Sequence, residues 1–433
     1  MKSQITPSIR KTLIIITSLM AGLFLTNDGN CQQSNWTHFR GNNLDGIAQA
    51  PHAPIQWKAD SNIVWKSEIH DIGWSSPVVY NGQVWVTTAS EDGKKMYAVC
   101  IDRNTGKVIH DILLFTPDSI HRKHNINSYA TPTPCIEEGF VYLHFGRYGT
   151  ACLNTQNGKV VWKRTDIEFL DIQGPGSSLM LYKDLLIMHC EGTDNQYILA
   201  LDKSSGKTVW QTERPKEIYD NLEPIGKKAY ITPIIVRVNG RDQMISNGSG
   251  VCIAYDPDTG KEIWRVVGGI DSTISMPFEE DGLVYFYTGF KKDPDGERYA
   301  ELLAVDPAGE GDVTKTHVVW RMRTPILQLL TPVVKNGMIY TIDTKSIMMC
   351  IDAKTGEIIW EKRVKGKFNA SPVYAGGRIY FSSVQGNVMV IREGRNLEIL
   401  AENSLEGEIW TTPVFIDGNI LIRTSKFLYK IGT

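Results

Sequence analysis

The stretch Ala254-Tyr255-Asp256-Pro257-Asp258-Thr259-Gly260-Lys261-Glu262-Ile263-Trp264 is the clearest copy of a phrase that recurs along this 433-residue chain. Related copies share an Asp or Asn, a Gly and a closing Trp or His, and they end at His110, Trp162, Trp210, Trp320 and Trp360. Successive copies end 40 to 56 residues apart. A period of this length is typical of an array of identical supersecondary units. The phrase therefore predicts a repeat architecture along most of the chain.

Each repeat contains four short strand-forming segments. Six repeats open their first strand with a Ser/Thr-Pro pair, at Ser76, Thr133, Thr232, Thr331, Ser371 and Thr412. Met276-Pro277 and Ser177-Ser178 hold the same place in the other two repeats. A pair such as Asn81-Gly82 follows and supplies the positive φ that a tight hairpin needs. We therefore predict an all-β fold, an eight-bladed β-propeller of four-stranded antiparallel blades.

The recurring phrase has a physical logic of its own. Its Asp bonds backbone amides two residues on, and its Gly takes the left-handed position that closes a short hairpin. We expect the closing Trp on the outermost strand, where its ring slots between adjacent blades. Burying one such ring removes roughly 200 Å² from water, which at about 25 cal/mol/Å² contributes at most about 5 kcal/mol. The tryptophans are therefore interpreted as structural fasteners.

Six cysteines follow the N-terminal segment, and their positions oppose a disulfide framework. Cys100, Cys152 and Cys350 each lie two residues before the Asp or Asn of the phrase, where Ala200, Ala254 and Ala304 stand in other repeats. A position that accepts Ala or Cys is typical of a small buried group. The sequence has no Cys-x-x-Cys and no adjacent cysteine pair, so a zinc site and haem attachment are unsupported.

The last repeat is one strand short of a complete blade. Its final strand, Phe427-Leu428-Tyr429-Lys430, is followed by three residues in the sequence. Ile63-Val64-Trp65-Lys66-Ser67 precedes the first blade and has the pattern of an outer strand with its Trp. We expect this N-terminal strand to complete the last blade and close the circle, which removes two sheet edges.

The N-terminal segment has the features of an export signal. Basic Arg10 and Lys11 precede the apolar run Thr12–Leu25, which is too short to span a membrane. The preferred cleavage follows Cys31, with Gly29 as the second small residue. A lipid anchor on Cys31 is the alternative, although Asp28-Gly29-Asn30 differs from a lipobox. We predict a signal peptide at 1–31 and a periplasmic or secreted protein.

After the signal, no linker or low-complexity stretch divides the chain. We therefore predict an N-terminal strap at 32–59 and one propeller domain at 60–433. The formal net charge of −2 argues against a nucleic-acid or anionic-membrane partner, because both require a basic surface. We expect a monomer without a transmembrane segment.

The phrase resembles the tryptophan-docking motif of the pyrroloquinoline quinone (PQQ)-like eight-bladed β-propellers. That superfamily includes quinoprotein alcohol dehydrogenases and the propeller lipoprotein of the outer-membrane β-barrel assembly machine. The opening Trp36-Thr37-His38-Phe39-Arg40-Gly41 is similar to the Trp-x-x-Phe-Arg-Gly start of an exported subgroup, as are residues 127–134 and 174–178. The resemblance covers nearly all of the mature chain and implies the fold. It does not select an activity, because the superfamily contains both enzymes and scaffolds.

The longest loops gather on one face, over blades two to four. Blade-to-blade crossings and the loops between second and third strands open on that face. They carry acidic, basic, amide and aromatic side chains on a rigid platform, as binding sites do. The candidate ligand-binding residues are His121, His124, Asn127, Tyr129, Arg147, Tyr148, Asp171, Glu191, Asp194 and Gln196.

Each candidate has a structural alternative. His121 and His124 are suited to metal binding or proton transfer, or they belong to a solvated basic loop. Glu191 and Asp194 form a possible acid–base pair, although an Asp in such a loop also forms turns. Asn127 precedes an innermost strand, as does Tyr129, so both are expected at the mouth of the channel.

The resemblance also raises the possibility of PQQ with calcium. In the related dehydrogenases the quinone lies between a Trp and a vicinal disulfide, and Glu and Asn hold calcium beside a catalytic Asp. This chain has no Cys-Cys pair, and little of it remains beyond the blades for long enclosing loops. Some quinoproteins lack that disulfide, so PQQ stays open as an alternative. No cofactor or metal is assigned.

The sequence favours an exported, non-catalytic propeller that binds a protein or glycan ligand on its loop-rich face. The alternative is an enzyme, either a PQQ-dependent alcohol or sugar dehydrogenase or a carbohydrate-active enzyme. A scaffold for outer-membrane β-barrel assembly is a further alternative, implied by the resemblance alone.

Overall fold

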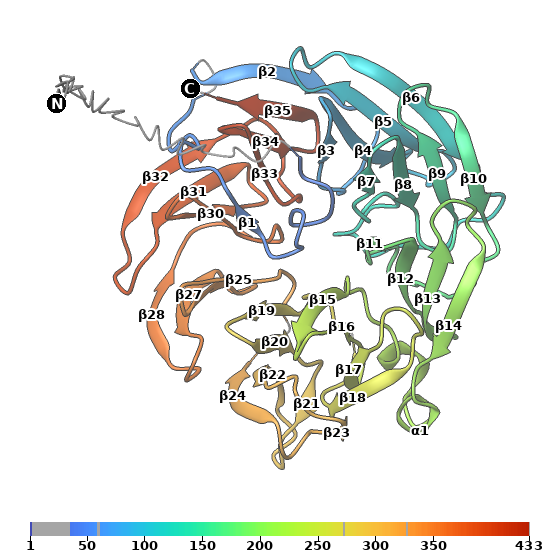
Figure 1. Ribbon diagram of the computed structural model, residues 1–433, viewed down its shortest axis with the longest axis vertical. Coiled ribbons are helices and arrows are strands. Elements are labelled where there is room, and N and C mark those ends of the chain that lie inside the picture. Colours follow the sequence, from blue (N-terminus) through green and yellow to red (C-terminus); the bar gives the residue numbers. More distant parts are fainter. Residues whose placement is uncertain (2–34, 59–60, 272, 326–327, 433) are drawn as a thin grey trace. The chain divides into compact units, whose positions relative to one another are not determined.

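Eight antiparallel sheets make up the computed structural model, which describes residues 1, 35–58, 61–271, 273–325 and 328–432. They radiate from a common axis as the blades of a β-propeller (Figure 1). The predicted fold class is therefore confirmed. The predicted signal peptide, apart from Met1, lies outside the described residues, and so does Cys31. Among the residues that are described, no helix has the length and hydrophobicity to cross a membrane.

The strands of each blade follow one another along the chain from the axis outward. Blade one contains β3 (Val78–Tyr80), β4 (Gln83–Ala89), β5 (Met96–Asp102) and β6 (Val108–Phe115). Blade two contains β7 (Cys135–Glu137), β8 (Phe140–His144), β9 (Thr150–Asn154) and β10 (Val160–Arg164). Blade three contains β11 (Met180–Tyr182), β12 (Leu185–Glu191), β13 (Gln196–Asp202) and β14 (Thr208–Glu213). Blade four contains β15 (Ile234–Val238), β16 (Arg241–Asn247), β17 (Val251–Tyr255) and β18 (Glu262–Val267).

The remaining four blades continue the pattern. Blade five contains β19 (Phe278–Glu280), β20 (Leu283–Tyr287), β22 (Arg298–Val305) and β24 (Val318–Thr324). Blade six contains β25 (Val333–Lys335), β26 (Met338–Ile342), β27 (Ile347–Asp352) and β28 (Ile358–Arg363). Blade seven contains β29 (Val373–Ala375), β30 (Arg378–Ser382), β31 (Asn387–Arg392) and β32 (Ile399–Ser404). Blade eight contains β33 (Val414–Ile416), β34 (Asn419–Arg423), β35 (Phe427–Ile431) and β2 (Ile63–Glu68).

Insertions add small elements at the rim of blades three to five. Helix α1 (Lys216–Tyr219) and the 3₁₀ turn η1 (Pro224–Gly226) lie in the crossing from blade three to blade four. Strand β21 (Lys291–Lys292) pairs with β22, and β23 (Gly311–Asp312) pairs in parallel with the outer strand β18. Strand β1 (Ile47–Ala48) belongs to the N-terminal strap.

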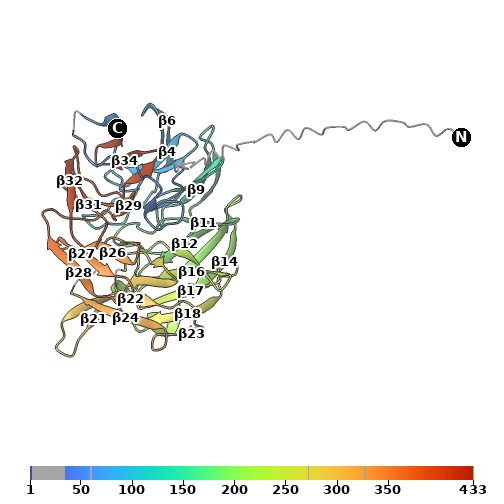
Figure 2. The ribbon, with the colours of Figure 1, turned by 60° about the vertical axis from the view of Figure 1, so that its left-hand side comes forward.

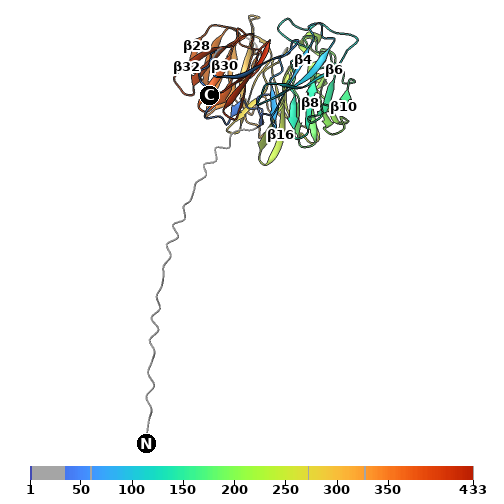
Figure 3. The same cartoon turned by 90° about the horizontal axis from the view of Figure 1, so that it is seen from above.

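The circle closes as the sequence predicts. Strand β2, from the N-terminal side of blade one, pairs antiparallel with β35 and becomes the outer strand of blade eight. Figure 1 shows β2 beside β35, close to the C-terminal end. Seen from above, β28 and β32 lie on one side of the ring and β6 and β10 on the other (Figure 3).

Tryptophans of the outer strands fasten several blades to the next. The indole N–H groups of Trp65, Trp162 and Trp320 donate to the carbonyl oxygen after the Asp of the following repeat, at 2.9, 2.9 and 3.0 Å. A Cβ on the Gly of that following phrase would lie within 2.8 Å of the ring, for example at Gly206 beside Trp162. That glycine also has a φ of +72°, so two constraints select it. The phrase is a fastener between blades.

The small position of the phrase faces the closing Trp directly. Cys152 pairs with Trp162 across the strands, Ala254 pairs with Trp264, and the other copies repeat this register. The six described cysteines are free and buried, so the prediction of a small buried group at this position is confirmed for Cys100, Cys152 and Cys350. Burial raises the pKa of the Cys152 thiol to about 12, which makes it an unreactive apolar group.

An N-terminal strap, residues 36–57, runs across the inner ends of the blades; Figure 2 gives a second view of the ring. Trp36 exchanges two backbone hydrogen bonds with Val79 of blade one, and Ile136 of blade two donates to the carbonyl oxygen of Thr37. Strand β1 then pairs in parallel with the innermost strand β29 of blade seven. The strap therefore ties together blades that are distant in sequence.

Arg40 is the central anchor of the strap. Its guanidinium is fully buried and donates to the carbonyl oxygens of Thr331, Pro332 and Pro372 at 2.7–3.1 Å. Burial lowers the pKa of Arg40 to about 10, so the side chain stays charged at neutral pH. A Cβ at Gly46 would lie 2.4 Å from this guanidinium. Arg40 and Gly46 thus fix the strap to the innermost strands of blades six and seven.

Candidate functional site at the channel mouth

The Ser/Thr-Pro positions form a ring around the propeller axis. In sequence order the ring residues, called here the inner ring, are Ser76, Thr133, Ser178, Thr232, Met276, Thr331, Ser371 and Thr412. Within it, the amide of one blade donates to the hydroxyl oxygen of the next at 3.0 Å, as Ser76 does to Thr133. The repeated hydroxyl therefore links neighbouring blades at the axis, and in most blades the proline after it directly precedes the innermost strand.

A second ring lies two residues upstream, toward the loop-bearing face. Because side chains alternate along an extended chain, residues two apart face the same side. The outer ring consists of Trp74, Thr131, Gly176, Tyr230, Ile274, Leu329, Asn369 and Trp410. The two rings, with Phe39 from the strap, enclose a cavity of about 350 Å³ to which all eight blades contribute.

The cavity is chemically neutral. Its described lining residues include no Asp, Glu, Lys or Arg, and they contain one imidazole, that of His124, and one phenol, that of Tyr230. Hydroxyl, amide and aromatic groups alternate with the apolar side chains of Ile274, Met276 and Leu329. A lining of this kind is typical of sites for uncharged small ligands.

Aromatic side chains stand on two sides of the cavity. The indole rings of Trp74 and Trp410 stack with centroids 5.3 Å apart and an interplanar angle of 19°. Both rings are half-buried, and they come from the adjacent blades one and eight. Tyr230 enters from blade four, on the other side of the axis, and its hydroxyl finds no hydrogen-bond acceptor among the described residues.

Two of the predicted site residues reach this cavity, His124 and Asn127. The Asn127 amide donates to the carbonyl oxygens of Gln173 and Pro175 at 2.9 and 3.1 Å, which joins the crossings into blades two and three. The backbone N–H of His124 donates to the same Gln173 oxygen, and the imidazole is exposed. Asn127 therefore shapes the mouth, and the His124 ring stands at its edge.

Three other predicted residues brace the loop above. The Tyr129 hydroxyl donates to the carbonyl oxygen of His121 at 2.8 Å, and the His121 amide donates to the Tyr148 hydroxyl at 3.0 Å. The two tyrosine rings meet edge-on with centroids 6.0 Å apart. Both tyrosines are buried, and burial raises the pKa of Tyr148 to about 12. The two tyrosine side chains therefore hold the loop that contains His121 in place, and the His121 ring itself is exposed.

Asp171 is a buried carboxyl group at the crossing into blade three. It is 3% exposed, and one carboxylate oxygen, Oδ2, has no hydrogen-bond partner among the described residues. Burial raises its pKa to about 7, and the charge of half-buried Arg147 partly offsets that rise. A Cβ at Gly146 would lie 2.1 Å from Oδ2, so the backbone of blade two packs directly on the carboxyl group.

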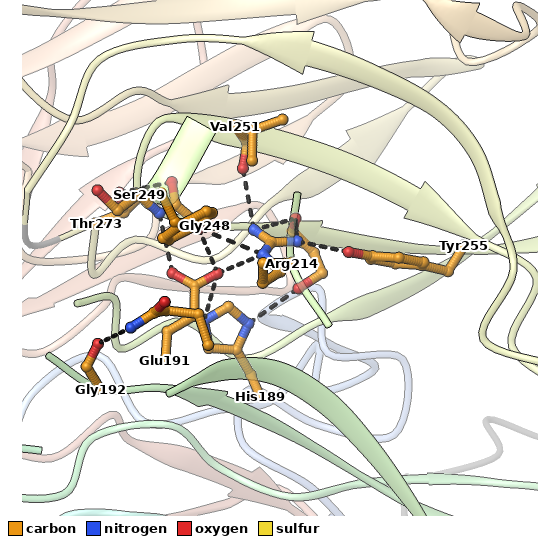
Figure 4. Close-up of polar contacts among 12 residues, drawn as sticks. His189, Glu191, Gly192, Arg214, Gly248, Ser249, Val251, Tyr255 and Thr273 are labelled. Atoms are coloured by element: carbon orange, nitrogen blue, oxygen red, sulfur yellow. Dashed lines mark hydrogen bonds and ion pairs between the residues drawn. The ribbon is translucent and has the colours of Figure 1, made fainter. Parts of the chain in front are cut away.

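Glu191 belongs to an interior network, shown in Figure 4. Its carboxylate pairs with the Arg214 guanidinium at 2.5 Å, and both side chains are fully buried. Tyr219 donates to Glu191 Oε1 at 2.9 Å, and Arg214 donates to the Tyr255 hydroxyl at 3.0 Å. A Cβ at Gly248 would lie 1.9 Å from the guanidinium, so glycine is required there. The pair fastens the crossing between blades three and four.

Opposite charge and burial act against each other in this network. Desolvation raises the pKa of Glu191, but the Arg214 charge and neighbouring donors outweigh it and hold the pKa below the usual range. The amide of Ser249 also donates to Glu191 at 3.1 Å. His189 lies 3.6 Å from the same carboxylate, and burial lowers its imidazole pKa. Glu191 is thus held ionised, away from the cavity.

The last two predicted residues form the hairpin loop of blade three. Exposed Asp194 accepts from the amides of Leu170 and Asn195 at 2.6 and 2.7 Å. The Gln196 side chain donates to the carbonyl oxygen of Gly192 at 2.9 Å. Asp194 and Glu191 therefore occupy different environments, one at the surface and one in the interior.

Sequence reasoning did not single out Trp74, Tyr230 and Trp410 as lining residues. The sequence nevertheless contains the pattern that identifies them, because each of the three residues lies two positions before the repeated Ser or Thr. Extending the alignment of repeats upstream by one pair of residues assembles the whole outer ring.

The cavity does not fit PQQ with calcium. The quinone carries carboxylates, and calcium takes carboxylate or carbonyl oxygen ligands. The described lining residues offer neither a cation for the first nor a carboxylate for the second. Across the described residues, no group of three or more His, Cys, Asp or Glu side chains is placed to hold a metal ion.

The eight blades and their docking tryptophans define a PQQ-type repeat propeller. The sequence matches the profile of the family described as outer membrane protein assembly factor BamB over residues 55–236, 194–314 and 254–403. Those stretches cover most of the chain, and the protein belongs to this family.

Individual relatives are distant. The chain is 22% identical over 279 residues to the outer membrane protein assembly factor BamB of Yersinia pestis, covering 54% of this chain and 69% of that protein. The crystal structure of BamB from Moraxella catarrhalis superposes with a TM-score of 0.58 at 15% identity, over 85% of this chain and 99% of that one. A europium-containing methanol dehydrogenase gives 0.68 at 11% identity, over 91% and 90%. At these identities the structural likeness establishes the fold alone.

Proposed function

We propose that this protein is an exported, non-catalytic binding propeller that holds a protein or glycan ligand on its loop-rich face. The observation that supports this proposal is that no charged Asp, Glu, Lys or Arg side chain lines the cavity among the described residues. The carboxylates with the most unusual environments, Glu191 and Asp171, lie in the interior, and neither lines the channel mouth. A rigid, uncharged cavity beneath polar loops is suited to holding a ligand.

Export rests on the basic start and apolar run of residues 10–25. The periplasm or the extracellular space is the proposed location, and the mature N-terminus reports which route the chain takes. Mass spectrometry is expected to find cleavage after Cys31. A diacylglyceryl group on Cys31 would instead place the protein on a membrane surface.

Site-specific photo-crosslinking tests partner binding. A photoreactive amino acid at exposed Asn125, on the loop-bearing face, is expected to give discrete protein or glycan adducts in the native host. The matched control carries the same group at exposed Asn157, in the turn between the outer strands of blade two. Equal adducts from both positions, or none from Asn125, would contradict the proposal.

Enzyme assays test the alternative that the protein is a catalyst. The purified protein is expected to show no oxidation of alcohols or sugars with PQQ and calcium, and no cleavage of oligosaccharides. Turnover that survives purification and is lost in an Asp194→Asn or His124→Ala variant would assign the face to catalysis.

Membership of the BamB family favours a second candidate, a scaffold in outer-membrane β-barrel assembly. This candidate predicts that the Asn125 crosslinks run to a component of the assembly machinery and that deletion lowers the level of outer-membrane barrels. Unchanged barrel levels would remove it and leave the binding function standing.

A further inference from the structure

We propose that the channel-mouth cavity binds the end of a neutral saccharide chain, with a sugar ring against the Trp74–Trp410 pair. This inference rests on the proposed binding function and names its ligand class. It is carried by the composition of the cavity wall, by unused hydrogen-bond donors, and by the strap at the inner end of the channel.

The wall selects against charge. Bringing an ionised group into a partly enclosed space without a countercharge costs several kcal/mol. The described lining residues provide no carboxylate, ammonium or guanidinium group. A phosphate, a uronic acid or a charged peptide end therefore finds no side chain of opposite charge inside except the His124 imidazole at the edge of the mouth. A neutral polyhydroxylated ligand loses no such interaction.

The inner ring presents donors. A hydroxyl group has one proton and two acceptor positions. In Thr133, Ser178 and Thr232 the oxygen accepts a backbone amide from the preceding blade. That bond fixes the side chain but leaves its proton available. Several fixed hydroxyl donors around one axis suit the many hydroxyl oxygens of a sugar.

The outer ring adds apolar faces with polar edges. The stacked indoles of Trp74 and Trp410 form one rigid wall, and the Nε1 atom of Trp74 has no hydrogen-bond partner among the described residues. Tyr230 on the other side offers a buried hydroxyl without an acceptor. A sugar ring has apolar C–H faces that stack on the indole wall and a polar perimeter that reaches the hydroxyl donors of the inner ring, whereas the buried Trp74 Nε1 and Tyr230 hydroxyl contact it only after their side chains rotate.

The N-terminal strap lies at the inner end of the cavity, opposite its mouth. Phe39 contributes to its lining, and Arg40 is bound to blade six and blade seven carbonyl oxygens beneath the inner ring. A strap at this place obstructs the passage of a polymer along the axis. At about 350 Å³ the cavity lies near the lower end of small-molecule sites. The ligand therefore enters by a chain end.

Calorimetry and ligand-observed NMR with the purified mature protein test the inference. The probes are neutral trisaccharides of glucose, mannose and N-acetylglucosamine, with a trimer of uronic acids as the charged control. At least one neutral trisaccharide is expected to bind, and the uronic trimer is expected to bind at least tenfold more weakly.

Three variants locate the site. Trp74→Ala is expected to weaken saccharide binding about 10- to 30-fold, because it removes an aromatic anchor. Trp410→Phe keeps an aromatic ring and is expected to weaken binding a few-fold. Tyr230→Phe keeps the ring and removes the hydroxyl, so it remains informative where Trp74→Ala fails to fold. Ile399→Ala, on the exposed outer strand of blade seven, is the matched control and leaves binding unchanged.

Several outcomes overturn the inference. They are no neutral saccharide binding at millimolar concentration, tighter binding of the uronic trimer, or neutral binding that Tyr230→Phe and Trp410→Phe leave unaffected. Protein adducts from Asn125 without saccharide binding would refute the ligand class and keep the binding function. Absence of both would refute the two together.

Discussion

The indole nitrogen of Trp65 donates a 2.9 Å hydrogen bond to the carbonyl oxygen of Arg103, which fastens the strand that completes blade eight to blade one. The Ser67 hydroxyl donates to the carbonyl oxygen of Gly106 in the same turn. Trp65→Ala removes the ring at the point where the circle closes. We expect a loss of about 3 kcal/mol in the free energy of unfolding, measured by urea denaturation.

Val64→Ala is the matched control, because Val64 is the adjacent residue in the same strand and is 52% exposed. It is expected to change the unfolding free energy by less than about 0.5 kcal/mol. Deleting residues 60–70 removes the strand entirely and is expected to unfold the protein. A soluble deletion product with a cooperative transition would refute closure by β2.

The fold could be predicted from the sequence because each repeat carries its own fastener. Trp162 and Gly206 come from different repeats, yet both are fixed by the same phrase, so their contact follows from the period. The strap could not be placed in the same way. Arg40 binds carbonyl oxygens about 290 and 330 residues away, and no local pattern specifies such a contact.

The site was predictable only in part. The long loops pointed to Asn127 and His124, and both residues line the cavity. The acidic residues were harder, because Glu191 and Asp194 are three apart in sequence but differ completely in burial. The burial of the Glu191 carboxylate depends on its ion pair with Arg214 and on the packing of blade four, and the spacing of residues in the sequence predicts neither.

The small position opposite the closing Trp predicts an asymmetric response to substitution. Cys152 faces Trp162, and other repeats place Ala there, so Cys152→Ala is expected to cost less than about 1 kcal/mol. Ala254→Leu adds volume against fully buried Trp264 and is expected to cost about 2–3 kcal/mol. Chemical denaturation of the two variants compares them directly. Similar losses would show that the position does not require a small side chain.

The Glu191–Arg214 pair predicts that removing one charge is worse than removing both. Glu191→Gln leaves the fully buried guanidinium without its countercharge, so we expect a loss of about 3–5 kcal/mol. The double variant Glu191→Leu with Arg214→Met removes both charges and is expected to be more stable than Glu191→Gln. Glu398→Gln breaks an exposed pair with Arg392 and is expected to leave the free energy of unfolding almost unchanged, because solvent screens the two charges. A double variant less stable than Glu191→Gln would contradict this account of the pair.

Asp171 predicts a stability difference that depends on pH. Burial raises its pKa from 3.8 to about 7, so between these values the native protein holds a proton that the unfolded chain has released. Stability therefore falls as pH rises through this window, by up to about 4 kcal/mol at 1.36 kcal/mol per pH unit. Below about pH 4 both states are protonated and the cost is absent.

Asp171→Asn keeps the shape of the side chain and removes the titration. The two proteins are expected to have similar melting temperatures at pH 4. As the pH rises to 7.5, the melting temperature of the variant is expected to exceed that of the native protein by a steadily larger amount. Buried His144 and His38, whose pKa values burial lowers to about 3 and about 4, destabilise both proteins equally in acid, so they cancel in the difference. Differential scanning calorimetry across this range measures it. A constant difference between the two proteins would show that Asp171 is ionised throughout, with its charge compensated by Arg147.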